Sequence, residues 1–428
     1  MNYEEALEKI RSFRRFGPKP GLDRIRRLLG ALGGPQEGLN VVHAAGTNGK
    51  GTACTLMASA LTQAGFRTGL YLSPHVCDFR ERIQVDGAMI PKDALASLAE
   101  RVCAEAERMR SAGESLAEFE VITALAFLWF SRCRCGAVVL ETGMGGRFDA
   151  TNVIRSPLVS VILSISLDHT RVLGNTLGQI AYEKSGIIKE GRPCVCSPDE
   201  PPEALAVLRR VAAERRSRLT EASLSGIRVL SSGLSGTEME YRGTRLRLPF
   251  PGEHQVRNAA AALAALEVLR EQGWDIPPQA VSRGFERARL PARLEVLSYR
   301  PPVLLDGAHN PGGTAALAAA LRHLLPGRKI VAVMGMMADK DVAAAVRNLD
   351  GLFSRVIAVA PPSPRAMPAG ELARIWQSRG VPAEAAEDSD AALRRAASLL
   401  GPDSALVVCG SLYLAGEMRG KLLARLKK

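Results

Sequence analysis

The sequence predicts an α/β protein of two domains, the larger built on a mostly parallel sheet with helices on both faces. Three observations support this fold class. The chain has 428 residues, which is more than a single hydrophobic core usually supports. Apolar strand-like runs alternate with helical segments through Tyr182, as in a parallel sheet covered by helices. A second, shorter alternation starts after Pro291 and the Pro301-Pro302 pair, so we assign residues 1–294 to the first domain and residues 295–428 to the second.

The first domain begins with helical periodicity and then changes to alternating strands and helices. Residues 3–32 predict two amphipathic helices that are interrupted at Phe16-Gly17-Pro18. Residues 39–45 predict an apolar strand that runs into a glycine-rich turn, and a helix is expected over residues 52–64.

The second half of the chain combines a small antiparallel element with another alternating set. Short alternating segments within residues 220–250, separated by Gly and Ser, predict the antiparallel element, and an alanine-rich helix follows over residues 256–272. Further strands are expected at residues 303–305, 330–334, 356–359 and 406–409. With helices between them and a last helix over residues 412–426, this set predicts a smaller Rossmann-like α/β domain.

The composition excludes several classes of protein. The chain is 46% hydrophobic and 23% charged, as in ordinary globular proteins, and no apolar run reaches the roughly 18–20 residues of a membrane helix. The start of the chain is acidic and amphipathic, unlike a signal peptide. The eight cysteines have no C-x-x-C spacing. We therefore expect a cytoplasmic protein that binds no membrane and keeps its thiols reduced.

The net charge of +12 has more than one interpretation. Nucleic-acid binding usually needs clustered basic residues with interleaved aromatics, whereas here the basic residues are dispersed and aromatics make up only 5%. A basic field also attracts polyanionic small molecules, and a high arginine content without function explains the charge equally well. We expect small polyanions, and no nucleic acid, as partners.

A glycine-rich segment between the first strand and the next helix has the chemistry of a phosphate-binding loop. Its central residues are Asn48, Gly49, Lys50, Gly51 and Thr52. Glycines let backbone N–H groups face phosphates, and a helix start favours negative charge. The Lys50 amine can offset phosphate charge, and the Thr52 hydroxyl can contact phosphate or Mg²⁺. The spacing departs from the strict G-x-x-x-x-G-K-[ST] pattern, so an ordinary glycine turn is the alternative.

The run Gly-Thr-Asn-Gly-Lys-Gly-Thr after a strand resembles the ATP-binding loop of the Mur ligase superfamily, specifically of its folylpolyglutamate and dihydrofolate synthase branch. Cell-wall Mur ligases usually have Lys followed directly by Ser or Thr, so Gly51 favours the folate branch. Only about forty residues precede the loop, too few for the extra domain that cell-wall enzymes place there. The resemblance implies a P-loop-type first domain that binds ATP.

Further segments extend the resemblance and imply a site for Mg²⁺, with two ions. Glu141 ends an apolar strand, where a carboxylate can hold a hard cation beside phosphates; a solvated strand end is the alternative. By resemblance, Ser73 and His169 are further ligands together with Thr52, although His169 alone would also suit a hydrogen-bonded turn. Lys184 lies where the family often carries a carbamylated lysine. An unmodified lysine that binds phosphate is the simpler alternative.

Residues 141–152 resemble the family segment that reaches the pterin substrate. The resemblance implies substrate contacts from Phe148, Asp149 and Ala150, with Asp149 suited to the donor edge of a pterin. Phe148 replaces the leucine that is usual there, which puts the packing of the ring system in question. Phe119 and Glu120 match another segment linked to the pteroate pocket, although a phenylalanine is more often part of the core.

Four residues near and beyond the predicted boundary complete the site. By resemblance, Asn258 is associated with the nucleotide and Arg293 reaches the ATP phosphates. Asp306 and His309 lie at the carboxyl end of a predicted strand, where open α/β sheets bind ligands. The resemblance implies that Asp306 contacts the nucleotide side and that His309 helps to position glutamate or the intermediate. The Asp339-Lys340-Asp341 run matches a further family segment, which we place only near the cleft.

These segments together predict an ATP-dependent ligase that joins L-glutamate to dihydropteroate, to the γ-carboxylate of a reduced folate, or to both. A carboxylate needs a better leaving group to form an amide, so we expect an acyl phosphate, with Lys50, Mg²⁺ and Arg293 neutralising charge. The expected catalytic residues are Lys50, Lys184, Asp306 and His309. The resemblance also implies a monomer.

Two rival functions stay open from the sequence. A Mur-type ligase for another acid shares most of the motifs, although the early loop and Gly51 argue against it. A nucleotide-binding switch or nucleic-acid ATPase would explain the loop and the positive charge. It would leave Lys184, Asp306 and His309 unexplained.

Overall fold

The computed structural model describes residues 1–14 and 20–426, so the predicted break at Phe16-Gly17-Pro18 lies outside the described residues. The chain forms two compact units. Unit 1 comprises Met1–Ile165, Thr170–Gly226 and Arg257–Ala288, and unit 2 comprises Ser166–His169, Ile227–Val256 and Arg289–Lys428.

This division cannot be expressed by one boundary along the chain. The predicted boundary follows residue 294, whereas the last division in the structure falls between Ala288 and Arg289. The segment Ile227–Val256 also groups with unit 2, and Leu234 of this segment packs against the core of that unit. The assignment of functions to residues 1–294 and 295–428 therefore stays a prediction.

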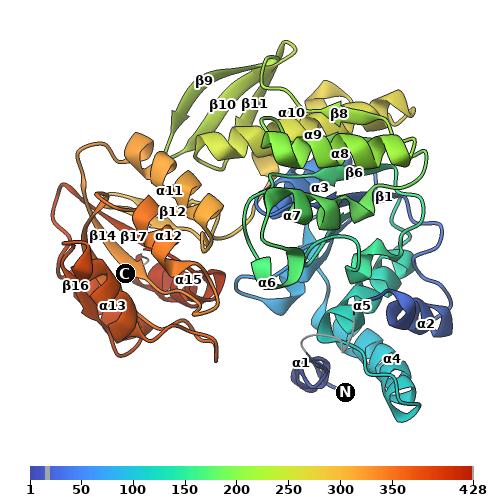
Figure 1. Ribbon diagram of the computed structural model, residues 1–428, viewed down its shortest axis with the longest axis horizontal. Coiled ribbons are helices and arrows are strands. Elements are labelled where there is room, and N and C mark those ends of the chain that lie inside the picture. Colours follow the sequence, from blue (N-terminus) through green and yellow to red (C-terminus); the bar gives the residue numbers. More distant parts are fainter. Residues whose placement is uncertain (15–19, 427–428) are drawn as a thin grey trace. The chain divides into compact units, whose positions relative to one another are not determined.

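The described residues of unit 1 form an eight-stranded sheet in the order β4-β3-β2-β5-β1-β6-β7-β8. Figure 1 labels β1, β6 and β8 of this sheet. The strands are β1 (Val41–Ala45), β2 (Thr68–Tyr71), β3 (Ile83–Val85), β4 (Ala88–Met89), β5 (Ala137–Glu141), β6 (Val159–Ile162), β7 (Cys194–Cys196) and β8 (Leu219–Glu221). Strands β2, β5, β1, β6, β7 and β8 run parallel, and β3 and β4 add an antiparallel edge. All five residues of β1 are buried, which explains why four of them are apolar.

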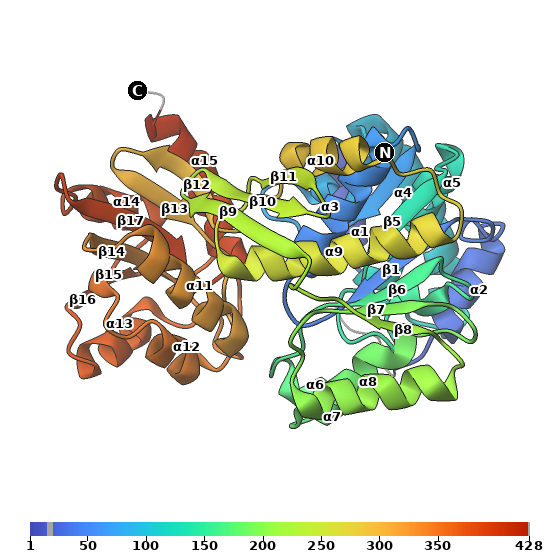
Figure 2. The same cartoon turned by 90° about the horizontal axis from the view of Figure 1, so that it is seen from above.

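Helices cover both faces of this sheet, which confirms the predicted fold class. They are α1 (Tyr3–Arg11), α2 (Asp23–Ala31), α3 (Lys50–Gln63), α4 (Lys92–Ser111), α5 (Glu118–Arg132), α6 (Thr170–Leu173), α7 (Leu177–Lys184), α8 (Pro202–Glu214), α9 (Glu253–Glu271) and α10 (Pro278–Arg287), with short 3₁₀ turns η1 (Phe79–Arg82), η2 (Ala150–Val153) and η3 (Ser185–Ile187). Apolar side chains of α1, α2, α4 and α5 form one core with Val138 and Leu140 of β5. Helices α3 and α10 pack together, as Figure 2 shows, and a Cβ on Gly284 would lie 2.5 Å from the Ala60 Cα.

Unit 2 contains a six-stranded sheet in the order β12-β13-β17-β14-β15-β16 and a three-stranded sheet in the order β11-β10-β9 within the described part of the chain. The strands are β9 (Ile227–Gly233), β10 (Gly236–Tyr241), β11 (Thr244–Leu248), β12 (Glu295–Tyr299), β13 (Pro302–Leu305), β14 (Lys329–Met334), β15 (Phe353–Ala358), β16 (Ala383–Ala385) and β17 (Ser404–Cys409). The helices are α11 (Pro311–Leu324), α12 (Val342–Asn348), α13 (Ala369–Ser378), α14 (Ser389–Ala397) and α15 (Leu412–Leu426).

The six-stranded sheet is parallel except for β12, which pairs antiparallel with β13. The four strands expected in this domain correspond to β13, β14, β15 and β17, and the antiparallel element corresponds to β9–β11. The sequence analysis missed β12 and β16, whose residues are largely only half-buried and so lack a strong apolar signal. None of the described helices is both long enough and apolar enough to cross a membrane.

Candidate active site

The glycine-rich loop connects β1, inside the parallel sheet, to the start of α3. The N–H groups of Thr47 and Asn48 donate to the Ser164 carbonyl oxygen at 2.8 and 3.4 Å, which ties the loop to the end of β6. Gly49 precedes α3 with φ of +84°, a left-handed conformation that favours glycine. The N–H groups in the first turn of a helix have no intrahelical acceptor, so this loop can bind an anion such as a phosphate.

Asn258 of α9 lies directly against this loop. A Cβ atom on Gly49 would be only 2.1 Å from the Asn258 Oδ1 atom. Asn258 is itself buried, so it has little room to move away. The structure thus places Asn258, which was linked to the nucleotide only by resemblance, against the loop whose chemistry predicts phosphate binding.

Two lysine amines meet at one carbonyl oxygen of the loop. Lys50 Nζ donates to the Gly46 carbonyl oxygen at 3.0 Å and to that of Thr47 at 3.3 Å. Lys184 Nζ, from the end of α7, donates to the same Gly46 oxygen at 2.7 Å. Both side chains are largely buried, and such amines attract polyanions strongly because little water screens them. The amines of the predicted catalytic residues Lys50 and Lys184 therefore lie beside the same carbonyl oxygen.

Glu141 and Ser73 lie beside this loop and offer oxygen atoms. The Ser73 N–H donates to Glu141 Oε2 at 2.9 Å, and Glu141 Oε1 lies 4.0 Å from Lys50 Nζ. The Ser73 hydroxyl oxygen is buried and has no hydrogen-bond partner among the described residues. A buried carboxylate and an unpaired hydroxyl are donors that Mg²⁺ prefers.

Protein side chains alone would not complete such a metal site. No three His, Cys, Asp or Glu side chains converge as metal ligands in residues 1–14 and 20–426. Mg²⁺ usually keeps several waters and binds through one or two carboxylates plus substrate phosphates. The residues present, with Thr52 buried at the start of α3, therefore fit Mg²⁺ that is held jointly with a phosphate.

Glu200 is a buried carboxyl group that no sequence motif singles out. It follows β7, and its Oε2 atom accepts a hydrogen bond from the Ile165 N–H at 3.0 Å. Burial raises the pKa of Glu200 to about 8, and the Ile165 bond and the Lys184 charge oppose that rise only in part. Its sequence context, an acidic pair before two prolines, is typical of an exposed loop.

We expect Glu200→Gln to stabilise unit 1 more at pH 8 than at pH 5. The folded pKa of about 8 lies above the ordinary 4.5, so the stability that Glu200 contributes is full below pH 4.5 and is lost as the pH rises towards 8. Glutamine retains an acceptor for the Ile165 N–H and carries no charge, which avoids a cost of about 1–3 kcal/mol at pH 8. Thermal unfolding at both pH values tests this, with the exposed neighbour Glu203→Gln as control. An equal effect at both pH values would contradict the raised pKa.

Asp149 organises the glycine-rich segment that follows β5. Its carboxylate accepts four hydrogen bonds from its own segment: from the Gly143 N–H at 2.8 Å, the Met144 N–H at 3.0 Å, the Thr151 N–H at 3.0 Å and the Thr151 hydroxyl at 2.6 Å. Burial raises the pKa of Asp149, and these bonds oppose the rise. The carboxylate is 6% exposed, so its predicted contact with a pterin stays a prediction.

The other predicted substrate residues differ in exposure. Phe148 is 52% exposed, whereas Ala150 is buried. Phe119 is half-buried and packs against the core, and a Cβ on Gly143 would lie 2.6 Å from its Cζ. Glu120 is buried, where it accepts the Ala117 N–H at 2.7 Å as a cap of α5 and pairs with Arg24 at 3.4 Å. These bonds give Glu120 a structural role, and its contact with substrate stays a prediction.

Asp306 and His309 follow β13 in unit 2. The Asp306 carboxylate accepts the Leu294 N–H at 2.8 Å and the Ala308 N–H at 2.7 Å, and burial raises the pKa of Asp306 against the effect of those bonds and of Arg293. His309 Nδ1 lies 2.8 Å from the Gly307 carbonyl oxygen, which accepts only, so Nδ1 carries the proton. Burial and then the Lys340 charge lower the pKa of His309 to about 4. His309 is therefore neutral near pH 7, with Nε2 as its acceptor atom.

Asp168 is a second residue that the sequence analysis did not select, although it precedes His169. The segment Ser166–His169 groups with unit 2, where Lys340 Nζ donates to Asp168 Oδ1 at 2.6 Å and Asn310 Nδ2 donates to Asp168 Oδ2 at 2.8 Å. Burial would raise the pKa of Asp168, but the charge and hydrogen bond of Lys340 together with the nearby His169 and His309 outweigh burial and hold the pKa well below its usual range. His169 has φ of +51°, a conformation that non-glycine residues rarely adopt. In the sequence, Lys340 could have been singled out by the Asp339-Lys340-Asp341 run, which matches a family segment.

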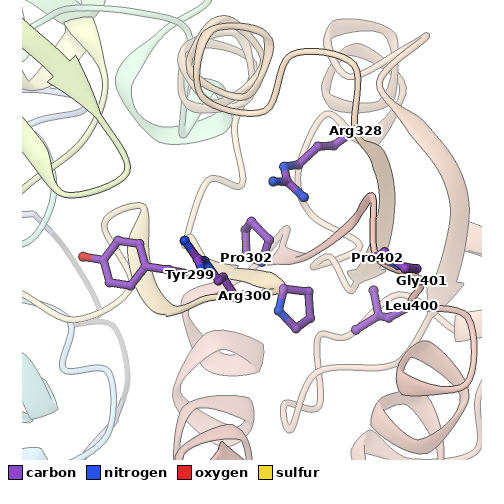
Figure 3. Close-up of a pocket in the computed structure, with 8 residues that line it drawn as sticks. Tyr299, Arg300, Pro302, Arg328, Leu400, Gly401 and Pro402 are labelled. Atoms are coloured by element: carbon purple, nitrogen blue, oxygen red, sulfur yellow. The ribbon is translucent and has the colours of Figure 1, made fainter.

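The predicted site residues thus fall into two groups. Unit 1 holds the loop residues 48–52, Phe119, Glu120, Phe148, Asp149, Ala150, Ser73, Glu141, Lys184 and Asn258; unit 2 holds His169, Arg293, Asp306 and His309. A pocket of about 520 Å³ also lies in unit 2, lined by Tyr299, Arg300, Arg328 and Pro402 among others, as Figure 3 shows. It lies at the amino ends of β13, β14 and β17, whereas Asp306 follows the carboxyl end of β13. The pocket is therefore separate from the candidate site.

Two family models match the chain. The Mur ligase middle domain matches residues 44–266, and the glutamate ligase domain of Mur ligases matches residues 292–412. The first match begins within β1 and takes in the glycine-rich loop, Glu141 and Lys184. The second includes Arg293, Asp306 and His309.

Curated relatives and solved structures are similar to this chain over nearly its whole length. The chain is 37% identical to the folylpolyglutamate synthase of Lacticaseibacillus casei over 99% of both proteins. It is 33% identical to the dihydrofolate synthase/folylpolyglutamate synthase of Bacillus subtilis over 98% of this chain and 99% of the relative. The structure is similar to Mycobacterium tuberculosis folylpolyglutamate synthase complexed with ADP and AMPPCP, with a TM-score of 0.90, 32% identity, and coverage of 98% and 99%. It is also similar to E. coli FolC in complex with DHPP and ADP, with a TM-score of 0.86, 29% identity, and coverage of 100% and 99%.

Proposed function

This chain belongs to the Mur ligase family, in its folylpolyglutamate synthase and dihydrofolate synthase branch, and from that membership we propose its reaction. It is an ATP-dependent carbon–nitrogen ligase that joins L-glutamate to dihydropteroate, to the γ-carboxylate of a reduced folate, or to both. The observation that carries this function is the loop after β1, where Lys50 and Lys184 share the Gly46 oxygen beside Glu141. The resemblance alone supports a cytoplasmic monomer, which we retain as an expectation.

ATP would bind to the loop after β1. The backbone of residues 48–52 would face the phosphates, with the Lys50 amine near the β- and γ-phosphates. Asn258 would contact the nucleotide because it already touches Gly49. Arg293 and Asp306, in unit 2, would contribute to the same nucleotide, and residues 295–428 would supply the glutamate-binding part.

Mg²⁺ would be held by Thr52, Ser73, Glu141 and His169, with a carbamylated Lys184 as a ligand for a second ion. When bound, the metal neutralises charge on the transferred phosphoryl group. The unpaired Ser73 hydroxyl and the buried Glu141 carboxylate support this assignment. Lys184 presents an unmodified amine to the Gly46 oxygen, so direct binding of phosphate by this amine is the competing role.

The reaction would proceed in two steps. A carboxylate oxygen of the acceptor attacks the γ-phosphorus of ATP, the bond to the β–γ bridging oxygen breaks, and an acyl phosphate and ADP form. The amine of glutamate then attacks the acyl carbon, loses a proton, and inorganic phosphate leaves. Lys50 and Arg293 would offset the negative charge of the first step. Neutral His309, whose Nε2 is an acceptor, would orient the amine of glutamate in the second.

A mass-spectrometric assay tests the function directly. The protein is incubated with ATP, Mg²⁺ and L-glutamate, with dihydropteroate in one tube and tetrahydrofolate in another, and ADP is measured in parallel. Addition of glutamate in both tubes would show a bifunctional enzyme, and addition in one would identify a single activity. ADP release that depends on another acid would favour a different Mur-type ligase. ADP release that needs neither acceptor nor glutamate would favour a nucleotide-binding ATPase.

We expect Gly49→Ala to reduce kcat/KM for ATP by about 10²-fold. The new methyl group would lie 2.1 Å from Asn258 Oδ1, so either the loop or α9 must shift. The control is Gly65→Ala, because Gly65 has φ of +94° and no described atom within 4 Å of its Cβ position. Both variants carry the left-handed backbone strain of about 1–2 kcal/mol, but only Gly49→Ala disturbs the loop. Equal ATP kinetics in the two variants would contradict this placement of Asn258.

A further inference from the structure

His43 is a fully buried polar residue in the middle of β1. Its neighbours across the sheet are Leu140 of β5 and Ser160 of β6. The His43 Nε2 atom lies 2.8 Å from the Thr151 hydroxyl oxygen in η2, and Thr151 is also fully buried. A histidine in the central strand of an apolar core is costly to bury, and among the described residues only the Thr151 hydroxyl is a hydrogen-bond partner of this ring.

The direction of each hydrogen bond can be derived. Thr151 Oγ1 lies 2.6 Å from Asp149 Oδ1, and four donors around the Asp149 carboxylate fit its ionised form, which can only accept. The single hydroxyl proton of Thr151 therefore points to Asp149. The Thr151 oxygen must then accept from His43, so the His43 proton is on Nε2. Burial, with a smaller effect from the Lys189 charge, lowers the pKa of His43 to about 3, which keeps the ring neutral at working pH.

The far end of this chain of hydrogen bonds reaches the acceptor segment. Asp149 Oδ2 accepts the N–H groups of Gly143 and Met144 at 2.8 and 3.0 Å. These residues lie between Glu141 and Phe148 along the chain. The segment also fits tightly on its other side, since a Cβ on Gly146 would lie 2.6 Å from the Lys184 carbonyl oxygen. A shift of Asp149 would therefore move the backbone between Glu141 and Phe148.

We propose that His43 is a positioning residue for the acceptor substrate, which acts through Thr151 and Asp149 on the backbone of residues 143–146. This inference rests on the proposed function, because it assumes that residues 141–152 bind the acceptor. His43 itself contacts neither ATP nor acceptor in this scheme. Its Nε2–H fixes the Thr151 hydroxyl, and the hydroxyl in turn fixes the carboxylate that holds the segment.

The kinetic test uses variants that remove or retain the two donors. His43→Leu and Thr151→Val are expected to raise KM for the acceptor at least tenfold and to change KM for ATP less than twofold. Rescue is expected from His43→Gln, whose amide can donate near the Nε2 position, and from Thr151→Ser, which keeps the hydroxyl. The double variant His43→Leu/Thr151→Val should be no worse than either single variant, because both break the same chain.

Thr68→Val is the matched control, since Thr68 is buried in β2 and its hydroxyl donates locally, to the Phe66 carbonyl oxygen at 2.9 Å. A merely structural role for His43 would change KM for ATP and for the acceptor alike, in His43→Leu as in Thr68→Val, and that result would overturn the proposal. If His43→Leu does not fold, the Thr151→Val and Thr151→Ser pair decides the matter by the same criterion.

A second measurement does not depend on turnover. ¹⁵N NMR of histidine-labelled wild-type protein should show His43 with its proton on Nε2 from pH 5 to pH 8, and Thr151→Val should shift the Nε2 resonance. A proton on Nδ1, or a resonance that titrates in this range, would overturn the hydrogen-bond chain. Wild-type protein that shows this signature but adds no glutamate would refute the proposed function and leave the chain intact.

Discussion

Lys50→Ala is expected to lower the rate of acceptor-dependent ADP release by about 10³-fold or more, equal to about 4 kcal/mol. The Lys50 amine lies at the phosphate loop, where it donates to the Gly46 and Thr47 carbonyl oxygens. Its side chain is 14% exposed, so its charge acts on a bound phosphate with little screening. Removal of the amine takes away one of the two buried cations beside this loop, and with it part of the charge that offsets the developing negative charge on the phosphoryl group.

A coupled assay for ADP and thermal unfolding of the same samples test this result. The unfolding temperature should change little, because the hydrogen bonds of the Lys50 amine to described residues stay within its own loop, and Glu141 Oε1 lies 4.0 Å away. Lys92→Ala serves as the control: Lys92 is exposed, and its charge pairs with Glu4 at 3.9 Å. Near-normal turnover in Lys50→Ala would assign the charge-neutralising role to another group, with Lys184 as the first candidate because it bonds to the same oxygen.

Glu141→Gln is expected to lower turnover by about 10²–10³-fold and to raise the Mg²⁺ concentration needed for half-maximal rate. Glutamine keeps the size of the side chain and an acceptor for the Ser73 N–H, which lies 2.9 Å from Glu141 Oε2. The substitution therefore removes the charge with little change in packing. The missing charge weakens the binding of a hard dication more than the altered hydrogen bond weakens the loop.

The informative measurement is a Mg²⁺ titration of glutamate addition at saturating ATP, for wild type and variant. Glu190→Gln is the control, since Glu190 is exposed and lies 3.8 Å from Arg216 on the surface of unit 1. If the rate of Glu141→Gln falls while its Mg²⁺ dependence stays that of wild type, Glu141 orients Ser73 and does not hold the metal. An unchanged rate would remove Glu141 from the site.

Much of the fold was predictable because its signals are local. The apolar run of β1, the glycines after it and the start of α3 are adjacent in sequence, so periodicity and turn chemistry identify them. The strands β13, β14, β15 and β17 were predicted for the same reason. The residue types needed for phosphate and cation chemistry could also be named, since each lies at the end of a predicted strand or the start of a helix. The resemblance of seven loop residues to the ATP-binding loop of the Mur ligases predicted the family, which the comparisons confirm.

Only the tertiary structure decided which of these residues meet. Lys184 reaches the Gly46 oxygen, Ser73 reaches Glu141, and Asn258 touches Gly49, although each pair is far apart in the sequence. It also placed the three-stranded sheet with unit 2 and revealed buried roles for Glu200 and Thr151. The physical reason is that strand propensity and helix capping depend on residues that are near in the sequence. The backbone hydrogen bonds between two strands are alike whichever strands pair, so they do not specify which strands become neighbours. The order of strands, and hence the partner of each buried charge, follows from how the whole set of apolar faces packs.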